Sequence, residues 1–150
     1  MSLQTSAIIG GIAGLSVSGV TICDLDDIPE AIAPGDLPLL FPEPLNTISN
    51  LVVTRDTMGA SLAKWTVTYD LTFTFCHHPI GAGYGLFAEY GAMVDKATAI
   101  LDALIEADLN DDGAVELAIA NTLNFGPVLD PAGNQYHGCQ FVLHVTEFIN

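Results

Sequence analysis

The segment from Lys64 to Cys76, KWTVTYDLTFTFC, alternates apolar and polar residues along its whole length. Large apolar or aromatic residues occupy every second position from Trp65 to Phe75, and most of the positions between them are threonines. Because successive side chains of a strand point to opposite faces of a sheet, this pattern predicts one long strand with one buried face. The polar second face favours an antiparallel sheet, since parallel strands covered on both sides are apolar throughout.

Two stretches of the chain have the spacing of amphipathic helices. In the first, apolar residues recur at helical intervals from Leu3 to Leu15, which predicts a short N-terminal helix. In the second, residues 86–107, one stripe is apolar and the charged residues lie away from it. We expect this long helix to cover the apolar face of the sheet. Its predicted sheet-facing stripe consists of Leu86, Tyr90, Val94, Ala97, Leu101, Leu104 and Ile105.

Shorter extended segments complete the predicted sheet. Two strands follow the long helix, at residues 115–123 and 139–148, and the arm that joins them contains the turn sequence DPAGN at 130–134. The predicted fold is a single domain, 1–150, of mixed α/β (α+β) class. It has a mostly antiparallel sheet, one long helix packed on one face, a short N-terminal helix and an extended acidic, proline-rich arm. Brief extended segments are expected at residues 20–23, 37–41 and 51–55.

The predicted arm, residues 24–44, has an unusual composition. Its sequence, DLDDIPEAIAPGDLPLLFPEP, holds six acids and five prolines but no lysine or arginine. Asp27 and Pro29 predict a helix start that Pro34–Gly35 ends after about one turn. The prolines restrict residues 37–41 to an edge position. We expect this part to lie on a neighbouring subunit, although it can instead cap its own sheet. The interface candidates are Leu37, Leu39, Leu40, Phe41 and Pro42.

The charge of the chain limits its classes of partner. Arg55, Lys64 and Lys96 stand against eighteen carboxylates, which gives a formal net charge of -15. Nucleic-acid binding depends on cations that neutralise phosphates, so sequence-specific binding to DNA or RNA is excluded. A role beside passing DNA is not excluded, because an acidic wall repels DNA without holding it. Adaptation to high salt is an alternative origin of the acid excess.

The apolar content and the N-terminal segment bear on where the protein acts. Half of the residues are apolar, so we expect other subunits to cover part of the surface. Residues 1–23 lack charge but contain too many polar residues and glycines for a stable membrane span, and they lack the basic start of a secretory signal. The three cysteines have no repeated spacing, which argues against a disulfide framework. These features predict a non-exported protein without a membrane partner.

One short motif has part of the pattern of a calcium-binding loop. In DLNDDGAVE, residues 108–116, the oxygen-bearing residues, the glycine and the aliphatic residue follow the EF-hand order. The twelfth loop position is Ile119 rather than a bidentate carboxylate, and the residues after the loop favour a strand. A polar helix-to-strand turn is therefore the favoured interpretation, and no metal or other cofactor is predicted. The weak calcium candidates are Asp108, Asn110, Asp112 and Glu116.

Other chemical motifs are incomplete. GAGYG, at residues 81–85, lies between a strand and a helix as a dinucleotide-binding loop would, but Leu86 replaces its third glycine. Cys76, His77 and His78 end one strand, yet no C-x-x-C pair supports a zinc site. No recognised nucleophile, metalloprotease or phosphate-binding motif occurs, so we expect a protein that is not an enzyme. Further histidines and cysteines lie near another strand: His137, Cys139 and His144.

The order of the predicted elements resembles that of the tail terminator and neck (head-to-tail joining) proteins of tailed bacteriophages. The resemblance rests on the acidic segment Asp36–Pro44, on the strand Trp65–Phe75 and on the closing segment Phe141–Phe148. As a topology, it covers nearly the whole chain. It implies a small α/β subunit that assembles into a ring, usually six-fold, at the head-proximal end of the tail tube.

Such a ring ends tube growth and joins the tail to the head. The expected partners are therefore other copies of this chain, the tail tube protein and a head-side connector or stopper protein. The resemblance implies a place in the virion tail or neck after assembly in the host cytoplasm, with DNA able to pass through the lumen, and it supplies no catalytic residues. Two alternatives remain open: a small calcium-binding module that uses the 108–116 loop, and a salt-adapted small soluble enzyme or binding domain.

Overall fold

A computed structural model describes the chain at residues 2–44, 46–55, 65–80, 88–107, 109, 115–119 and 123–149; for 115–119 it describes the backbone alone. The fold contains two α-helices, two short 3-10 helices and seven strands within these residues. The helices are α1 Thr5–Ala13, η1 Leu25–Asp27, η2 Pro34–Asp36 and α2 Tyr90–Glu106. The strands are β1 Thr21–Ile22, β2 Leu39–Pro42, β3 Ile48–Arg55, β4 Trp65–Pro79, β5 Val115–Ile119, β6 Phe125–Leu129 and β7 Gln135–Ile149.

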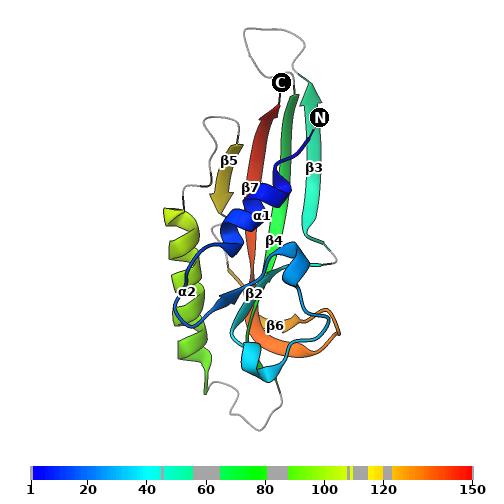
Figure 1. The fold of residues 1–150 in the computed structure, drawn as a ribbon. Helices are drawn as coiled ribbons and strands as arrows, with labels where there is room; N and C mark the ends of the chain where they lie inside the picture. Colours follow the sequence, from blue (N-terminus) through cyan, green and yellow to red (C-terminus); the bar gives the residue numbers. More distant parts are fainter. Residues whose placement is uncertain are drawn as a thin grey trace.

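Two long antiparallel strands form the centre of the sheet (Figure 1). β4 and β7 have 15 residues each and pair from Trp65 with Ile149 to Pro79 with Tyr136. Two short strands share each outer edge: β3 and β2 lie along β4, while β5 and β6 lie along β7. β1 pairs with β2 and gives the only parallel contact among the described strands. The predicted mixed α+β class, with a mostly antiparallel sheet, is confirmed.

The main core lies between the sheet and the two helices. Alternate residues of β4 from Val67 to Phe75 are buried, together with their neighbours on β7 from Cys139 to Val145. The short helix α1 covers them with Ile8, Ile9 and Ile12. The alternation of residues 65–75 therefore correctly predicts the buried face of the long strand.

The long helix α2 buries a stripe rotated from the predicted one. Met93, Ala97, Ile100 and Leu104 face the core, whereas Ile105 is 64% exposed. Tyr90 is also exposed, and its ring lies edge-on against Phe125 of β6, with ring centroids 6.3 Å apart. Met93, three positions along the helix, belongs to the main core cluster instead. The remaining members of that prediction are partly buried (Val94 and Leu101) or lie outside the described residues (Leu86).

The acidic segment covers the other face of the sheet, opposite the main core, at the end where β2 and β6 lie. Residues 24–37 cross this end, and a second apolar cluster forms beneath them from Cys23, Ile32, Leu39, Phe41, Cys76 and Tyr136. Thr72 and Thr74 of β4 are buried on the same face, while Thr68 nearer the other end is exposed. The predicted polar face is therefore open to solvent over only part of its length.

The interface prediction for residues 37–42 requires correction. The strand β2 pairs with β4 on one side and with β1 on the other, so its own chain occupies both edges. Leu40 packs in the main core, while Leu39 and Phe41 pack in the second cluster. Pro42 is buried at the strand end and Leu37 is partly buried beside the same cluster. The segment caps its own sheet because its alternate side chains find apolar partners on both faces.

Two local predictions also differ from the structure. No α-helix forms after Asp27; instead η1 and η2 flank residues 28–33, since the prolines at 29 and 34 stop helix propagation. The strand expected at 115–123 is β5, with residues 120–122 outside the described part. The predicted arm before the DPAGN turn contains the strand β6. The sequence pattern does not indicate this strand, because Gly126 and Pro127 are residue types that are unusual inside strands.

A buried carboxylate anchors α1 to the sheet. Glu147 of β7 accepts hydrogen bonds from the backbone N–H of Gln4, at 2.7 Å, and from the Tyr69 hydroxyl, at 2.5 Å. Gln4 directly precedes α1, so the negative charge lies near the positive end of the helix dipole. Burial, and then the neighbouring Glu147, raise the pKa of Tyr69 far above its ordinary value.

Asp130 fastens the acidic segment to the β6–β7 hairpin. Its carboxylate accepts hydrogen bonds from the backbone and side-chain amides of Asn134, at 2.8 and 3.0 Å. It also accepts bonds from the Tyr136 hydroxyl and from the backbone N–H of Ile32, both at 3.3 Å. Burial alone raises the pKa of Asp130, but these hydrogen bonds outweigh it and hold the pKa below its ordinary value.

We expect Asp130→Ala to lower the free energy of unfolding at pH 7 by about 2–3 kcal/mol, since the substitution leaves buried donors unpaired. The folded pKa of Asp130 is depressed, so its contribution is present above the unfolded pKa of about 3.9 and is lost as pH falls through the folded pKa. Urea unfolding at several pH values should show the difference from wild type shrinking in acid. Asp102→Ala, on the exposed side of α2, is the control. An equal loss of unfolding free energy in that variant would contradict the stabilising role of the Asp130 hydrogen bonds.

Candidate interaction surface

The strand β3 forms an exposed edge of the sheet. It pairs with β4 along one side, and no described strand pairs with its other side. A free strand edge presents unpaired N–H and C=O groups, which are a template for pairing with another chain. Four large apolar residues of β3 are exposed: Ile48 at 40%, Leu51 at 47%, Val52 at 56% and Val53 at 43%.

The charge of this edge differs from that of the rest of the chain. No acid occurs between Glu43 and Asp56 in the sequence, and β3 ends in Arg55, one of only three cations. The Arg55 guanidinium lies 5.3 Å from the centre of the Trp65 ring, a cation–π contact that holds it at the strand end. The strand itself therefore carries four exposed apolar side chains, no carboxylate and one positive charge at its end.

A polar cluster on the open sheet face holds the start of β3 in place. The pairing of β3 with β4 shifts between Ser49 and Val52, where Asn50 adopts a positive φ of 53°. The Asn50 amide donates to Asp70 Oδ2 at 2.8 Å, and Asp70 Oδ1 contacts His144 Nδ1 on β7. Burial alone raises the pKa of Asp70, but the bonds from Asn50 and His144 outweigh it and lower the pKa. The bulge is thus tied to both central strands, while Val52–Arg55 continue as a regular edge.

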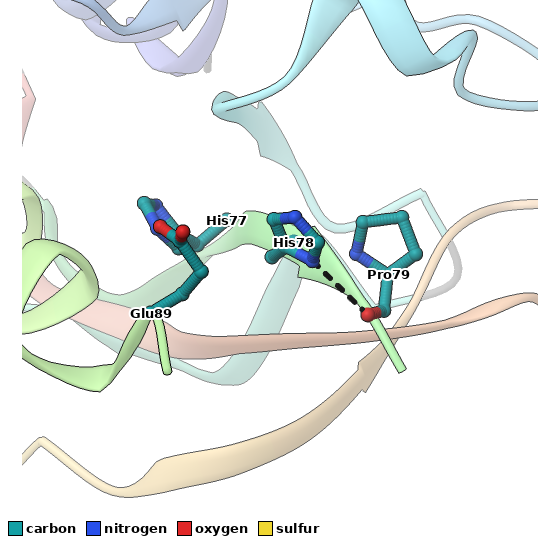
Figure 2. A network of polar contacts seen from close by, with 4 residues as sticks. All are labelled: His77, His78, Pro79 and Glu89. Atoms are coloured by element: carbon teal, nitrogen blue, oxygen red, sulfur yellow. Dashed lines mark hydrogen bonds and ion pairs between the residues drawn. The ribbon is translucent and has the colours of Figure 1, made fainter. Parts of the chain in front are cut away.

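A second candidate is a cavity beside the start of α2 (Figure 2). It has a volume of about 430 Å³, and prolines and Leu37 line it together with His77, His78 and Glu89. In Figure 2, His77 faces Glu89, while the His78 ring lies apart and contacts the Pro79 carbonyl oxygen. His77 Nε2 is 3.4 Å from Glu89 Oε2, but the buried His77 Nδ1 has no hydrogen-bond partner among the described residues. Glu89 was not among the residues singled out from the sequence.

The protonation of His77 follows from its burial. Burial lowers the pKa of His77, and the nearby Glu89 carboxylate opposes this shift only in part. The imidazole is therefore neutral at pH 7, with Nε2–H donating to Glu89 and Nδ1 left as an acceptor. A buried acceptor without a donor costs stability. The site can take a hydrogen-bond donor, but its geometry defines no reaction.

A polar hollow of about 660 Å³ lies on the open sheet face. It is near the junction of β2 with β3 on one edge and near β6 on the other. The buried Thr74 hydroxyl donates to Glu43 Oε2 at 2.6 Å and is 3.4 Å from Gln140 Nε2, so it links two of the polar side chains. Asn46 and Phe125 contribute to its walls. The lining suits hydroxyl or amide groups, and nothing in the sequence pattern indicated it.

The histidines and cysteines considered for zinc do not converge. His78 and His137 are cross-strand partners, whereas Cys76 lies opposite Gly138 and Cys139 lies opposite Phe75. Across the described residues, no three metal-binding side chains are placed to hold an ion. All three cysteines are free and buried, and burial raises the pKa of Cys76 and of Cys139 to about 12. Their thiols are therefore protonated.

The remaining sequence candidates fall largely outside the described residues. Asp108, Asn110 and Asp112 of the calcium-like loop lie there, as does GAGYG at 81–85. Glu116 belongs to β5, which confirms that a strand follows the loop. Calcium binding by these residues stays a prediction.

Replacing His77 with phenylalanine tests the unpartnered nitrogen. We expect His77→Phe to raise the free energy of unfolding by about 1 kcal/mol at pH 7.5, because a buried unsatisfied polar atom is removed. The lowered pKa means that the unfolded chain takes up a proton first, so wild type loses stability as pH falls below about 6.5. The advantage of the variant should therefore grow at pH 5 in urea unfolding. His78→Phe is the control, and a destabilised His77→Phe protein would show that Nδ1 has a bonding partner.

No protein-family model matches the chain. A search of curated proteins also gives no significant match. In the part of the chain that is described, no helix is long and apolar enough to cross a membrane. Evidence for function therefore comes from the geometry of the molecule and from its sequence pattern.

Proposed function

We propose that this protein is a structural subunit that assembles with copies of itself into a ring. The observation that carries the proposal is the exposed edge of β3, with its apolar side chains at Ile48 and at Leu51–Val53. Proteins that stay monomeric protect such edges with lysines, prolines or a covering loop. Here a bulge disturbs only the start of the strand, and no described strand pairs with the outer side of the rest.

The charge of the chain supports assembly through this edge. With eighteen acids against three cations, most surfaces of two copies repel each other. The β3 edge lacks carboxylates, so two copies approach there at the lowest electrostatic cost. Salt screens the repulsion between the remaining acids. Assembly should therefore strengthen as the salt concentration rises.

The resemblance to tail terminator and neck proteins gives the proposed ring a specific location and role. The element order that motivated it is present: a short helix, an acidic proline-bearing segment, a long strand, a long helix and a closing hairpin. On this reading the ring, usually six-fold, lies at the head-proximal end of a phage tail tube, ends tube growth and joins the tail to a head-side connector. Its acidic wall lets DNA pass without holding it.

Size-exclusion chromatography with light scattering tests the assembly. We expect a single ring species over a wide concentration range, either alone or after addition of purified tail tube. Electron microscopy of tube ends with bound protein tests the location. A chain that stays monomeric in both conditions, at low and at high salt, would exclude the proposal.

A charged residue on the edge should prevent assembly. We expect Val52→Lys to give a monomer by light scattering, because a buried unpaired ammonium is costly at a strand interface. Its free energy of unfolding should change by less than about 0.5 kcal/mol, since Val52 is exposed in the isolated subunit. Ile105→Lys, on exposed α2, is the matched control and should assemble like wild type. Normal rings from Val52→Lys would remove β3 from the interface.

A further inference from the structure

We propose that β3 of one subunit pairs with β5 of the next, so that one continuous antiparallel sheet runs from subunit to subunit. This inference rests on the proposed function and names the surface that receives β3. Both strands lie at the borders of the sheet, since β3 pairs only with β4 and β5 pairs only with β7 among the described strands. In Figure 1 they flank the central pair on opposite sides.

The two edges lie at the same level of the sheet. β3 pairs with residues 65–71 of β4, and β5 pairs with residues 143–147 of β7. Residues 143–147 in turn lie opposite 67–71, so the strands form one four-stranded cross-section in the order β3, β4, β7, β5. A copy displaced sideways and rotated about an axis along the strands therefore brings its β5 to the height of β3.

Strand direction makes the two edges compatible. Each of the three pairings in this cross-section is antiparallel, so β3 and β5 run in opposite directions within one subunit. A rotation about an axis along the strands preserves these directions. The β5 strand of the next subunit is therefore antiparallel to β3, and the alternation of the sheet continues across the boundary. Such a head-to-tail contact uses two different surfaces and closes into a ring when the rotation is completed.

The charges of the two edges are complementary. β3 carries one cation, Arg55, and no acid, whereas β5, with the sequence VELAI, carries one acid, Glu116, and no cation. Arg55 lies level with Trp65 and Glu116 level with Thr68, so the two charges do not form a direct cross-strand pair but attract each other across the boundary. A symmetric contact of β3 with β3 would bring together no opposite charges and would leave the β5 edge unpaired in both copies. The opposite charges of the two strands and the otherwise unpaired β5 edge therefore favour β5 as the partner of β3.

Disulfide cross-linking tests this pairing in the full chain. Strands paired antiparallel place opposite Cα atoms about 4.5–5.5 Å apart, a separation that a disulfide spans. We would combine Val52→Cys with Ala118→Cys, and in a second variant with Glu116→Cys, to cover two adjacent registers. Oxidised glutathione serves as the oxidant. Wild type is the background control because its three cysteines are buried, and Ile105→Cys with Ala118→Cys is the matched control for surface exposure.

A covalent ladder that ends at the ring size, from one of the two double variants, is the expected result. An equimolar mixture of Val52→Cys and Ala118→Cys single variants should stop at covalent dimers that contain one of each. Dimers from Val52→Cys alone would show a β3-to-β3 contact and overturn the inference. Rings by light scattering without cross-links in either register would also overturn it while leaving the proposed function intact, whereas a strict monomer would contradict both.

Discussion

The antiparallel pairing of β4 with β7 is the constraint on which the other elements depend. Each of these strands is about twice as long as any neighbour that could cover it, so each outer edge is shared by two short strands. This division makes the ends of the sheet different. At one end, the acidic segment covers the second face of the sheet; at the other, β3 and β5 leave one edge free on each side.

The acidic segment shows how one stretch of chain serves both the core and the surface. Its apolar residues Ile32, Leu39 and Phe41 are buried against Cys76, while Asp26 and Asp36 are exposed. Prolines keep it from forming a helix or a long strand, so it crosses the sheet as an irregular cover held by its bond to Asp130. Because this apolar surface is already used within the subunit, the proposed assembly needs another surface, and β3 holds four of the eight large hydrophobic residues that are exposed in the described part of the chain.

The sequence predicts elements whose patterns are local, but not the layers formed between distant segments. The alternation from Trp65 to Phe75 reports one buried face directly. It cannot report that Ile32, which is distant in the sequence, packs in one cluster with Cys76 on the other face. The exposure of Val52 likewise depends on which strands lie beside β3, and the His77–Glu89 contact depends on where α2 begins. Gly126 and Pro127 hide β6 because neither residue favours a strand.

An exposed apolar edge and a strongly acidic surface act together in selecting a partner. The edge alone would pair with many exposed strands, which is the origin of aggregation in β proteins. In the proposed assembly, repulsion among the eighteen acids disfavours most orientations of two copies, so the contact is expected at the β3 edge, whose own residues include no carboxylate. Because β3 and β5 run in opposite directions, a rotation about an axis along the strands allows the same contact to repeat from one copy to the next. In the proposed assembly, repulsion restricts how the copies meet, while the strand ladder holds those that meet correctly.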